Sequence, residues 1–402
     1  MQVDLIAMGA GGAESLTAEA AASLAGADWL VGAERLLAVL PAGCTARRTA
    51  ATRPAAVRDA LLAARQAGAV RAGVVLSGDT GFYSGAAGLL PLLQAAEIPA
   101  RVLPGVSSVQ LLAARLGRPW QNWRLVSAHG VLCDPAAELA EGKPVFFLTG
   151  GTQGPSWVAA RLRDAGLPDL PVTVGERLGL PGERITHTTA ADCVAMSFDG
   201  LSVLLAEAAP CPGVMGPGVP DELFCRGKVP MTKREVRAAA LSRLRVQPGE
   251  TCWDVGAGTG SVSIELALAA RGGAVWAVEQ NAAACDLIRL NRRRFGAWNL
   301  QLREGLAPAA LADLPAPDAV FVGGTKGNMD AILAAALEKN PAARICVSAI
   351  APETLAAALA AFAARGQAAQ AVQIAVSRSR AVAGLHLMEA ANPITLVAAN
   401  CP

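Results

Sequence analysis

The chain has 402 residues, of which 53% are hydrophobic and 17% charged, and its formal net charge is +2. This length is too great for one ordinary core, so we expect at least two domains. The small net charge and the 4% aromatic content argue against a nucleic-acid partner. No apolar run is long and uninterrupted enough to span a bilayer, which argues against a membrane protein.

The nine cysteines are scattered without any CxxC pair, and the chain has three histidines in all. This pattern gives no zinc framework and fits a reducing compartment, so we expect no metal site. The first strand-like segment, residues 3–6, begins directly at the N-terminus without a basic region or cleavage site, which favours a cytoplasmic protein.

Three small polar turns punctuate the first half of the chain, each at the end of an apolar run or at the start of a helix. They are residues 9–12 after the strand 5–8, residues 77–83 after the strand 74–76, and residues 104–108 before the helix 109–116. Ligands bind at the carboxyl ends of strands in open α/β sheets, so three such turns favour one shared crevice.

These turns, together with residues 127–130, 148–151 and 174–179, resemble the tetrapyrrole methylases, in particular their CbiE branch. The likeness covers residues 1–209 and implies a class III methyltransferase fold of two α/β subdomains with S-adenosylmethionine (SAM) between them. By position, the resemblance assigns the following residues to SAM: Gly9, Gly11, Gly78, Asp79, Tyr83, Ser107 and Ser108.

Two residues of this block have competing interpretations. His129 is a candidate catalytic acid or base, although a lone histidine is more often structural. Tyr83 is the one tyrosine of the chain, and its alternative role is that of a half-buried ring with its hydroxyl in water.

Residues 210–230 are rich in proline and glycine, which prevent regular structure. The sequence therefore predicts a linker over 210–230 between a domain of residues 1–209 and a second domain of residues 231–402.

The second domain is organised around residues 254–260, Asp-Val-Gly-Ala-Gly-Thr-Gly, between a predicted strand 251–253 and a predicted helix 261–270. The glycines let the backbone approach a ligand, and the helix end offers N–H groups. A dinucleotide site needs its third glycine where this chain has Ser261, so the spacing favours SAM.

Glu279 ends the predicted strand 274–279, where an acid can accept hydrogen bonds from both ribose hydroxyls. Further strands over 300–305, 318–324 and 345–348 indicate a Rossmann-like class I methyltransferase domain. Thr232 followed by Glu235 predicts a capping box at the start of a helix.

Over residues 231–402 these motifs occur in the order typical of the CbiT family, the decarboxylating precorrin methyltransferases, which this domain resembles. The family usually has an acid at the position of Leu306, so here we expect only backbone and apolar contact with adenine. The resemblance implies SAM contacts for the following residues: Thr232, Gly256, Ala257, Gly258, Thr259, Gly260, Glu279, Leu306 and Ala307.

A CbiE-like half joined to a CbiT-like half is similar to the fused CobL family. This likeness implies methyl transfer from SAM, one molecule per domain, to carbons 5 and 15 of precorrin-6B in cobalamin biosynthesis. It also implies loss of the ring-C acetate carboxylate as carbon dioxide, giving precorrin-8, and a homo-oligomer.

A polycarboxylate substrate calls for cationic side chains, because guanidinium and ammonium groups pair with carboxylates. Lys233, Arg234 and Arg237 are the first candidates, with a solvated helix face as their alternative role. The catalytic candidates are therefore Lys233, Arg237 and His129, with no general base assigned.

Three other functions stay open at this point. The same reactions on a cobalt-containing precorrin fit equally well, since the macrocycle carries the metal. A nucleic-acid methyltransferase would need a basic face and stacking aromatics. A non-catalytic SAM-binding sensor would bind SAM without turnover.

Overall fold

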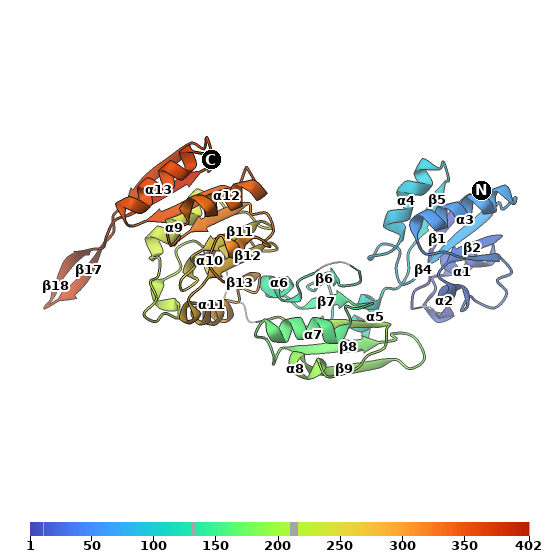
Figure 1. Ribbon diagram of the computed structural model, residues 1–402. Coiled ribbons are helices and arrows are strands. Elements are labelled where there is room, and N and C mark those ends of the chain that lie inside the picture. Colours follow the sequence, from blue (N-terminus) through green and yellow to red (C-terminus); the bar gives the residue numbers. More distant parts are fainter. Residues whose placement is uncertain (11, 131–132, 210–215, 402) are drawn as a thin grey trace. The chain divides into compact units, whose positions relative to one another are not determined.

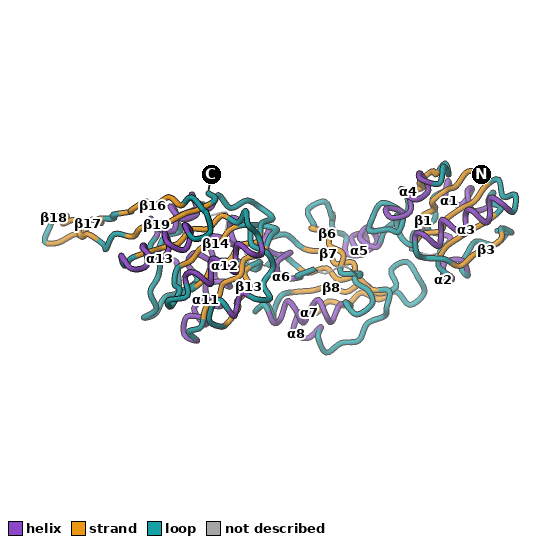
Figure 2. Tube along the Cα trace, turned by 45° about the horizontal axis from the view of Figure 1, so that its top comes forward, coloured by secondary structure: helices purple, strands orange, loops and turns teal. Residues whose placement is uncertain are grey.

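The computed structural model describes residues 1–10, 12–130, 133–209 and 216–401. The chain forms two compact units: Met1–Cys133 with Pro144–Glu207, and Asp134–Lys143 with Ala208–Pro402. Helices and strands alternate through both units, as the α/β prediction required (Figures 1 and 2). In the part of the chain that the structure describes, no helix is long and apolar enough to cross a membrane.

The first unit begins with a parallel five-stranded sheet in the order β3-β2-β4-β1-β5. Its central strands are apolar and buried on both faces, one face under α1 and α2 and the other under α3 and α4. The elements are β1 (Gln2–Ala7), η1 (Ala13–Ser15), α1 (Ala18–Ala25), β2 (Trp29–Gly32), α2 (Glu34–Leu37), β3 (Arg47–Ala50), α3 (Pro54–Gln66), β4 (Arg71–Leu76), α4 (Ala86–Ala95) and β5 (Ala100–Leu103).

A second five-stranded sheet of this unit has the order β6-β7-β10-β8-β9, in which only β6 and β7 run parallel among the described pairs. The helix α5 packs on one of its faces. Its elements are α5 (Ser108–Leu116), β6 (Arg124–Ser127), β7 (Val145–Leu148), α7 (Pro155–Asp164), β8 (Pro171–Glu176), β9 (Arg184–Thr189), α8 (Ala190–Cys193) and β10 (Ser202–Ala206). The two sheets confirm the predicted pair of α/β subdomains.

The second unit contains a seven-stranded sheet in the order β13-β12-β11-β14-β15-β19-β16. One face is covered by α9, α10 and α11 and the other by α12 and α13, so its strands are buried on both faces. This arrangement confirms the Rossmann-like prediction. The elements of the sheet and its helices are α9 (Arg234–Leu244), β11 (Thr251–Val255), α10 (Ser261–Ala269), β12 (Ala274–Glu279), α11 (Ala282–Arg294), β13 (Leu300–Glu304), η4 (Ala309–Leu311), β14 (Ala319–Val322), α12 (Met329–Lys339), β15 (Arg344–Ala349), α13 (Pro352–Ala363), β16 (Ala369–Ile374) and β19 (Ile394–Ala399).

A hairpin of β17 (Ser377–Val382) and β18 (Leu385–Ala390) connects β16 to β19 and extends away from the sheet (Figures 1 and 2). Three shorter elements complete the unit: α6 (Pro135–Glu138), η2 (Leu139–Glu141) and η3 (Asp221–Leu223).

Residues 216–230, the described part of the predicted linker, pack against the second unit. The backbone N–H groups of Gly218 and Val219 donate to Glu265 at 2.8 and 3.0 Å. Phe224 is buried and its ring lies 4.7 Å from that of Phe295, centroid to centroid. Residues 210–215 lie outside the described residues, and the boundary between the two domains stays a prediction.

The capping box predicted at Thr232 is wrong. Helix α9 begins at Arg234, and its N-cap residue, Lys233, makes no side-chain cap hydrogen bond. Glu235 instead pairs with Arg378, with 2.5 Å between Oε2 and the guanidinium. The Glu235 carboxylate, which the local pattern assigned to the helix end, therefore forms a long-range ion pair with Arg378.

Candidate functional site

Two glycine turns meet at the carboxyl edge of the second unit's sheet. Strands β11 and β14 are parallel neighbours, so the turns that follow them lie side by side. A Cβ atom on Gly256 would lie 2.5 Å from the carbonyl oxygen of Gly324, so only glycine fits there. Both turns border the same cavity.

This cavity has a volume of about 1110 Å³, slightly larger than ordinary ligand pockets. Its wall includes most residues that the resemblance assigned to SAM in this domain. They are Thr232, Gly256, Ala257, Gly258, Glu279, Leu306 and Ala307. The candidate Lys233 lies in the same wall. The structure thus gathers these residues, while their contact with SAM stays a prediction.

The Glu279 carboxylate is held rigidly at the end of β12. One oxygen accepts the N–H of Gly258 at 2.8 Å, and the other accepts those of Gln280 and Asn281 at 2.9 Å each. A carboxylate has about four acceptor positions, so these three donors leave room for one more. A ligand hydroxyl can use it without a rearrangement of the loop.

Thr259 and Gly260 are not among the described residues that line the cavity, and their contact with SAM stays a prediction. Thr259 is buried, and its carbonyl oxygen accepts a hydrogen bond from Asn291 at 2.9 Å. A Cβ atom on Gly260 would lie 2.9 Å from the Ile288 side chain, so this glycine serves the packing of α10 against α11. The loop turns inward at these positions to begin the helix.

The first turn of α10 is tied to the end of β11 by a buried acid. Asp254 accepts hydrogen bonds from the hydroxyl and the backbone N–H of Ser263, in the first turn of that helix. Burial raises the pKa of Asp254 to about 7, against the lowering effect of these bonds. The helix end is therefore capped from within the protein.

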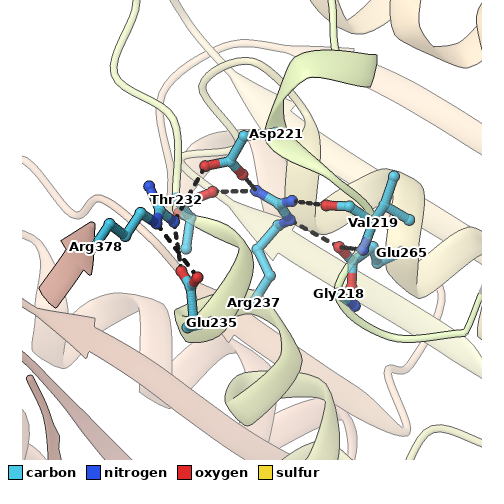
Figure 3. A network of polar contacts seen from close by, with 8 residues as sticks. All are labelled: Gly218, Val219, Asp221, Thr232, Glu235, Arg237, Glu265 and Arg378. Atoms are coloured by element: carbon cyan, nitrogen blue, oxygen red, sulfur yellow. Dashed lines mark hydrogen bonds and ion pairs between the residues drawn. The ribbon is translucent and has the colours of Figure 1, made fainter. Parts of the chain in front are cut away.

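Arg237 lies in the core, which corrects its placement on the rim of the cavity. Its side chain is 0% exposed, and its guanidinium stacks 4.7 Å from the Phe224 ring. Figure 3 shows its polar partners, which are Glu265 at 2.8 Å, Asp221 at 2.9 Å, the Val219 carbonyl at 2.5 Å and the Thr232 carbonyl. This arginine therefore holds the segment that leads into α9 and does not meet a substrate.

The cavity is also lined by cationic side chains that the sequence analysis did not identify. Lys326 follows the Gly323–Gly324–Thr325 turn and has a φ of 49°, in the left-handed region. Its position two residues after the predicted strand 318–324 was the available signal. Arg378 enters from β17, where it pairs with Glu235 (Figure 3). No local pattern pointed to it, because its neighbours in space are distant in sequence.

A second cavity, of about 310 Å³, lies within the first unit. It brings together all the described residues that the resemblance assigned to SAM in this half, and His129. They are Gly9, Gly78, Asp79, Tyr83, Ser107 and Ser108. Gly11 lies outside the described residues. The three predicted turns thus share one cavity, as their positions at strand ends required, and their contact with SAM stays a prediction.

The turns around this cavity are tied to one another. The backbones of Gly9 and Gly78 exchange two hydrogen bonds, of 3.1 and 2.9 Å. Asp79 accepts the N–H of Gly81 at 2.8 Å and of Gly105 at 3.0 Å, so it joins two of the turns. Gly78 has a φ of +68°, and no atom lies within 4 Å of a Cβ placed on it. The backbone there is open to a ligand.

Tyr83 differs from its alternative role as a half-buried ring. It is 55% exposed, with a φ of 46°, and its hydroxyl donates to the Leu125 carbonyl at 3.0 Å. The contact connects the turn after β4 to strand β6.

Comparison with known proteins matches each half of the chain to a family of methyltransferases. The description "Tetrapyrrole (Corrin/Porphyrin) Methylases" matches residues 2–194, and "Precorrin methyltransferase domain" matches residues 222–400. A precorrin-6Y C(5,15)-methyltransferase [decarboxylating] of Sinorhizobium is 36% identical over 329 residues, which cover 80% of this chain and 78% of that protein.

A cobalt-precorrin-6B C(15)-methyltransferase (decarboxylating) of Salmonella typhimurium is 40% identical over 181 residues, 44% of this chain and 93% of that protein. A crystal structure of a precorrin-6y C5,15-methyltransferase from Geobacter metallireducens is 34% identical and covers 45% of this chain and 97% of its own, with a TM-score of 0.44.

A tetrapyrrole methylase domain followed by a precorrin methyltransferase domain defines a two-domain methyltransferase. The likeness to the Sinorhizobium protein extends over most of both chains. The chain belongs to the family of the decarboxylating precorrin-6Y C(5,15)-methyltransferases.

Proposed function

We propose that the chain methylates precorrin-6B at carbons 5 and 15 and removes the ring-C acetate carboxylate as carbon dioxide, giving precorrin-8 in cobalamin biosynthesis. The second unit carries out the decarboxylation and the methylation of carbon 15, and the first unit methylates carbon 5. The observation that carries this division is that each unit has its own cavity at glycine turns.

The residues of both cavities fit SAM, one molecule in each unit. In the second unit, the free acceptor position of Glu279 suits a ribose hydroxyl, and Leu306 and Ala307 offer apolar contact to adenine. In the first unit, the open space above Gly78 admits a ligand to the backbone. SAM supplies an electrophilic methyl group, so the protein needs no nucleophilic side chain of its own.

The cations of the larger cavity bind and orient the substrate. Lys228, Lys233, Lys326 and Arg378 line it, and Glu279 is the acid among its described lining residues. A polycarboxylate macrocycle meets a positive wall there, which fixes its orientation. Orientation and exclusion of water are what methyl transfer to a ring carbon requires from the protein.

The apolar part of the same wall suits decarboxylation. Ile350, Ile374, Val376 and Ile394 line the cavity beside the cations. A carboxylate held against apolar side chains is poorly solvated, so loss of carbon dioxide relieves the cost of its charge. The remaining electron pair delocalises into the conjugated ring.

The test uses the full chain with SAM and precorrin-6B, followed by mass spectrometry. The expected product has gained two methyl groups and lost one carbon dioxide. Glu279→Ala should leave the methyl gain at carbon 5 and lose the gain at carbon 15. Ser77→Trp, which puts an indole into the smaller cavity, should leave decarboxylation with one methyl gain. If Ser77→Trp abolishes the gain at carbon 15 while Glu279→Ala does not, the assignment is reversed.

A cobalt-containing precorrin is the second candidate substrate, because the Salmonella relative of the second unit is named for one. Parallel single-turnover rates on precorrin-6B and its cobalt form decide between them. The predicted homo-oligomer is tested by light scattering of the purified chain.

A further inference from the structure

We propose that His129 is the catalytic base of the first unit: its Nε2 removes the proton that the newly methylated ring carbon must release. This inference rests on the proposed methylation of carbon 5 in that unit.

The sheet brings His129 to the cavity next to Thr149. Strands β6 and β7 are parallel, with Ser127 opposite Leu148, and the N–H of Ala128 donates to the Leu148 carbonyl at 2.9 Å. Both strands therefore end at the same edge, and the residues that follow them face the same cavity.

The protonation of the His129 ring follows from its contact with Thr149. Nδ1 lies 3.4 Å from the Thr149 carbonyl oxygen, which can only accept a hydrogen bond. The contact therefore favours the neutral tautomer with the proton on Nδ1, which leaves the free electron pair on Nε2. The ring has the tautomer that a base acting through Nε2 requires.

The carbonyl that orients the ring is itself fixed. Thr149 is 4% exposed, and its hydroxyl donates to the Ser202 carbonyl on β10 at 2.6 Å. The next residue, Gly150, exchanges backbone hydrogen bonds of 3.2 and 3.1 Å with Gln153, which close the turn.

Gly150 makes room for the imidazole. A Cβ atom at this position would overlap Nδ1, Cε1 and Cγ of His129, so the ring lies directly over the glycine. Any side chain at position 150 would displace the ring from the Thr149 carbonyl. The position of the His129 ring therefore depends on the glycine that follows the neighbouring strand, β7.

The other ionisable groups of the cavity are less suited to accept a proton. Both oxygens of Asp79 already accept backbone N–H groups. The Tyr83 hydroxyl donates to a carbonyl. Arg35 and Arg177 also line the cavity, and both are cations without an acceptor. Of the described lining residues, His129 is the one with an imidazole.

The step balances without any further reactant. The ring carbon uses a π electron pair to form the new C–C bond, and the C–S pair stays on sulfur, which leaves as a thioether. That carbon then carries both the methyl group and its original hydrogen. His129 Nε2 takes this hydrogen as a proton, the C–H electron pair restores the conjugated ring, and the imidazolium returns the proton to water.

The test is His129→Asn in the full chain, with carbon-5 and carbon-15 methylation scored separately in single turnovers. Asparagine keeps a donor near the position of Nδ1 and has no base at Nε2. General-base catalysis contributes typically ~10²–10⁴-fold, so carbon-5 methylation should fall by at least about 100-fold. Carbon-15 methylation and carbon dioxide release should not change, nor should either activity in His386→Asn, on the exposed hairpin.

A second variant guards against a merely structural effect. His129→Gly should lose carbon-5 methylation and regain it on addition of imidazole, because the small base can enter the vacated space. Carbon-5 activity of His129→Asn within about threefold of wild type, or a His129→Gly variant that imidazole does not rescue, would overturn the proposal. Absence of carbon-5 methylation in the wild-type chain would instead overturn the proposed function.

Discussion

Asp254 caps helix α10 through Ser263, whose hydroxyl and backbone N–H both donate to its carboxyl group. The other carboxyl oxygen, Oδ1, has no partner among the described residues, and the side chain is buried. The Asp254 carboxyl group at the start of the glycine loop is therefore buried with only part of its hydrogen-bonding capacity satisfied, so its negative charge is poorly stabilised. Its protonation should therefore influence the stability of the second unit.

We predict that Asp254 makes stability depend on pH. Its pKa is raised from 3.8 to about 7 in the folded chain. Between these two pH values the folded state therefore binds a proton at Asp254 that the unfolded state has released. The stabilising contribution is complete below about pH 4 and is lost as pH rises to about 7, with a slope of up to about 1.4 kcal/mol per pH unit.

Urea unfolding of wild type and Asp254→Asn at about pH 5 and about pH 8 measures this effect. The variant should gain stability relative to wild type at the higher pH, because its amide stays neutral. An equal difference in unfolding free energy at both pH values would contradict the prediction.

The buried guanidinium of Arg237 should be essential for stability. Arg237→Met leaves the buried Glu265 carboxylate without its counter-charge, so we expect a loss of about 3–5 kcal/mol of unfolding free energy. The matched control is Arg303→Met, whose ion pair with Asp313 is exposed (44% and 83%) and should cost below about 1 kcal/mol. Denaturant titration compares them, and equal costs for the two variants would refute the structural role of Arg237.

Glu279→Gln should weaken SAM binding to the second unit. A hydrogen bond to a charged group contributes about 1.5–3 kcal/mol, so we expect about a 10- to 100-fold higher Kd. Glu304→Gln is the control, since Glu304 lies opposite Glu279 in the register of β12 and β13. Calorimetric titration should show two binding sites per chain in wild type, one of them weakened only in Glu279→Gln. Two unchanged sites would rule out a role for Glu279 in donor binding.

Lys326→Gln should raise the KM for the precorrin about tenfold while SAM affinity stays unchanged, because a charged hydrogen bond to a carboxylate is lost. Lys143→Gln is the control, as Lys143 is exposed and pairs with Glu141. The KM of the wild type should also rise with salt, more steeply than that of Lys326→Gln. If the two variants have the same KM, Lys326 does not contact the substrate.

Much of the fold was predictable because its signals are local. Strand β12 has the bounds expected from its apolar run ending in Glu279, and the turns at Gly78, Ser107 and Gly256 were assigned from their position after strands or before helices. In an α/β sheet such turns meet at one edge, so predicting the strands also predicted which turns would share a cavity.

The glycine loop shows where local reasoning ended. The resemblance assigned every residue from Gly256 to Gly260 to the ligand, whereas Thr259 is buried and Gly260 lies against Ile288 of α11. Which residues of a loop face a cavity depends on the helices that pack behind it, and no pattern within the loop contains that information.

By itself the sequence determined two α/β halves with glycine turns at their strand ends, since periodicity and spacing act between near neighbours. Their assignment as methyltransferases came from the resemblance to known families. Only the tertiary structure decided which charges meet. It buried Arg237 beside Glu265, brought Arg378 across 143 positions to Glu235, and laid the His129 ring over Gly150. These contacts join segments far apart in the chain, and burial and register, which are properties of the packed sheet, determine them.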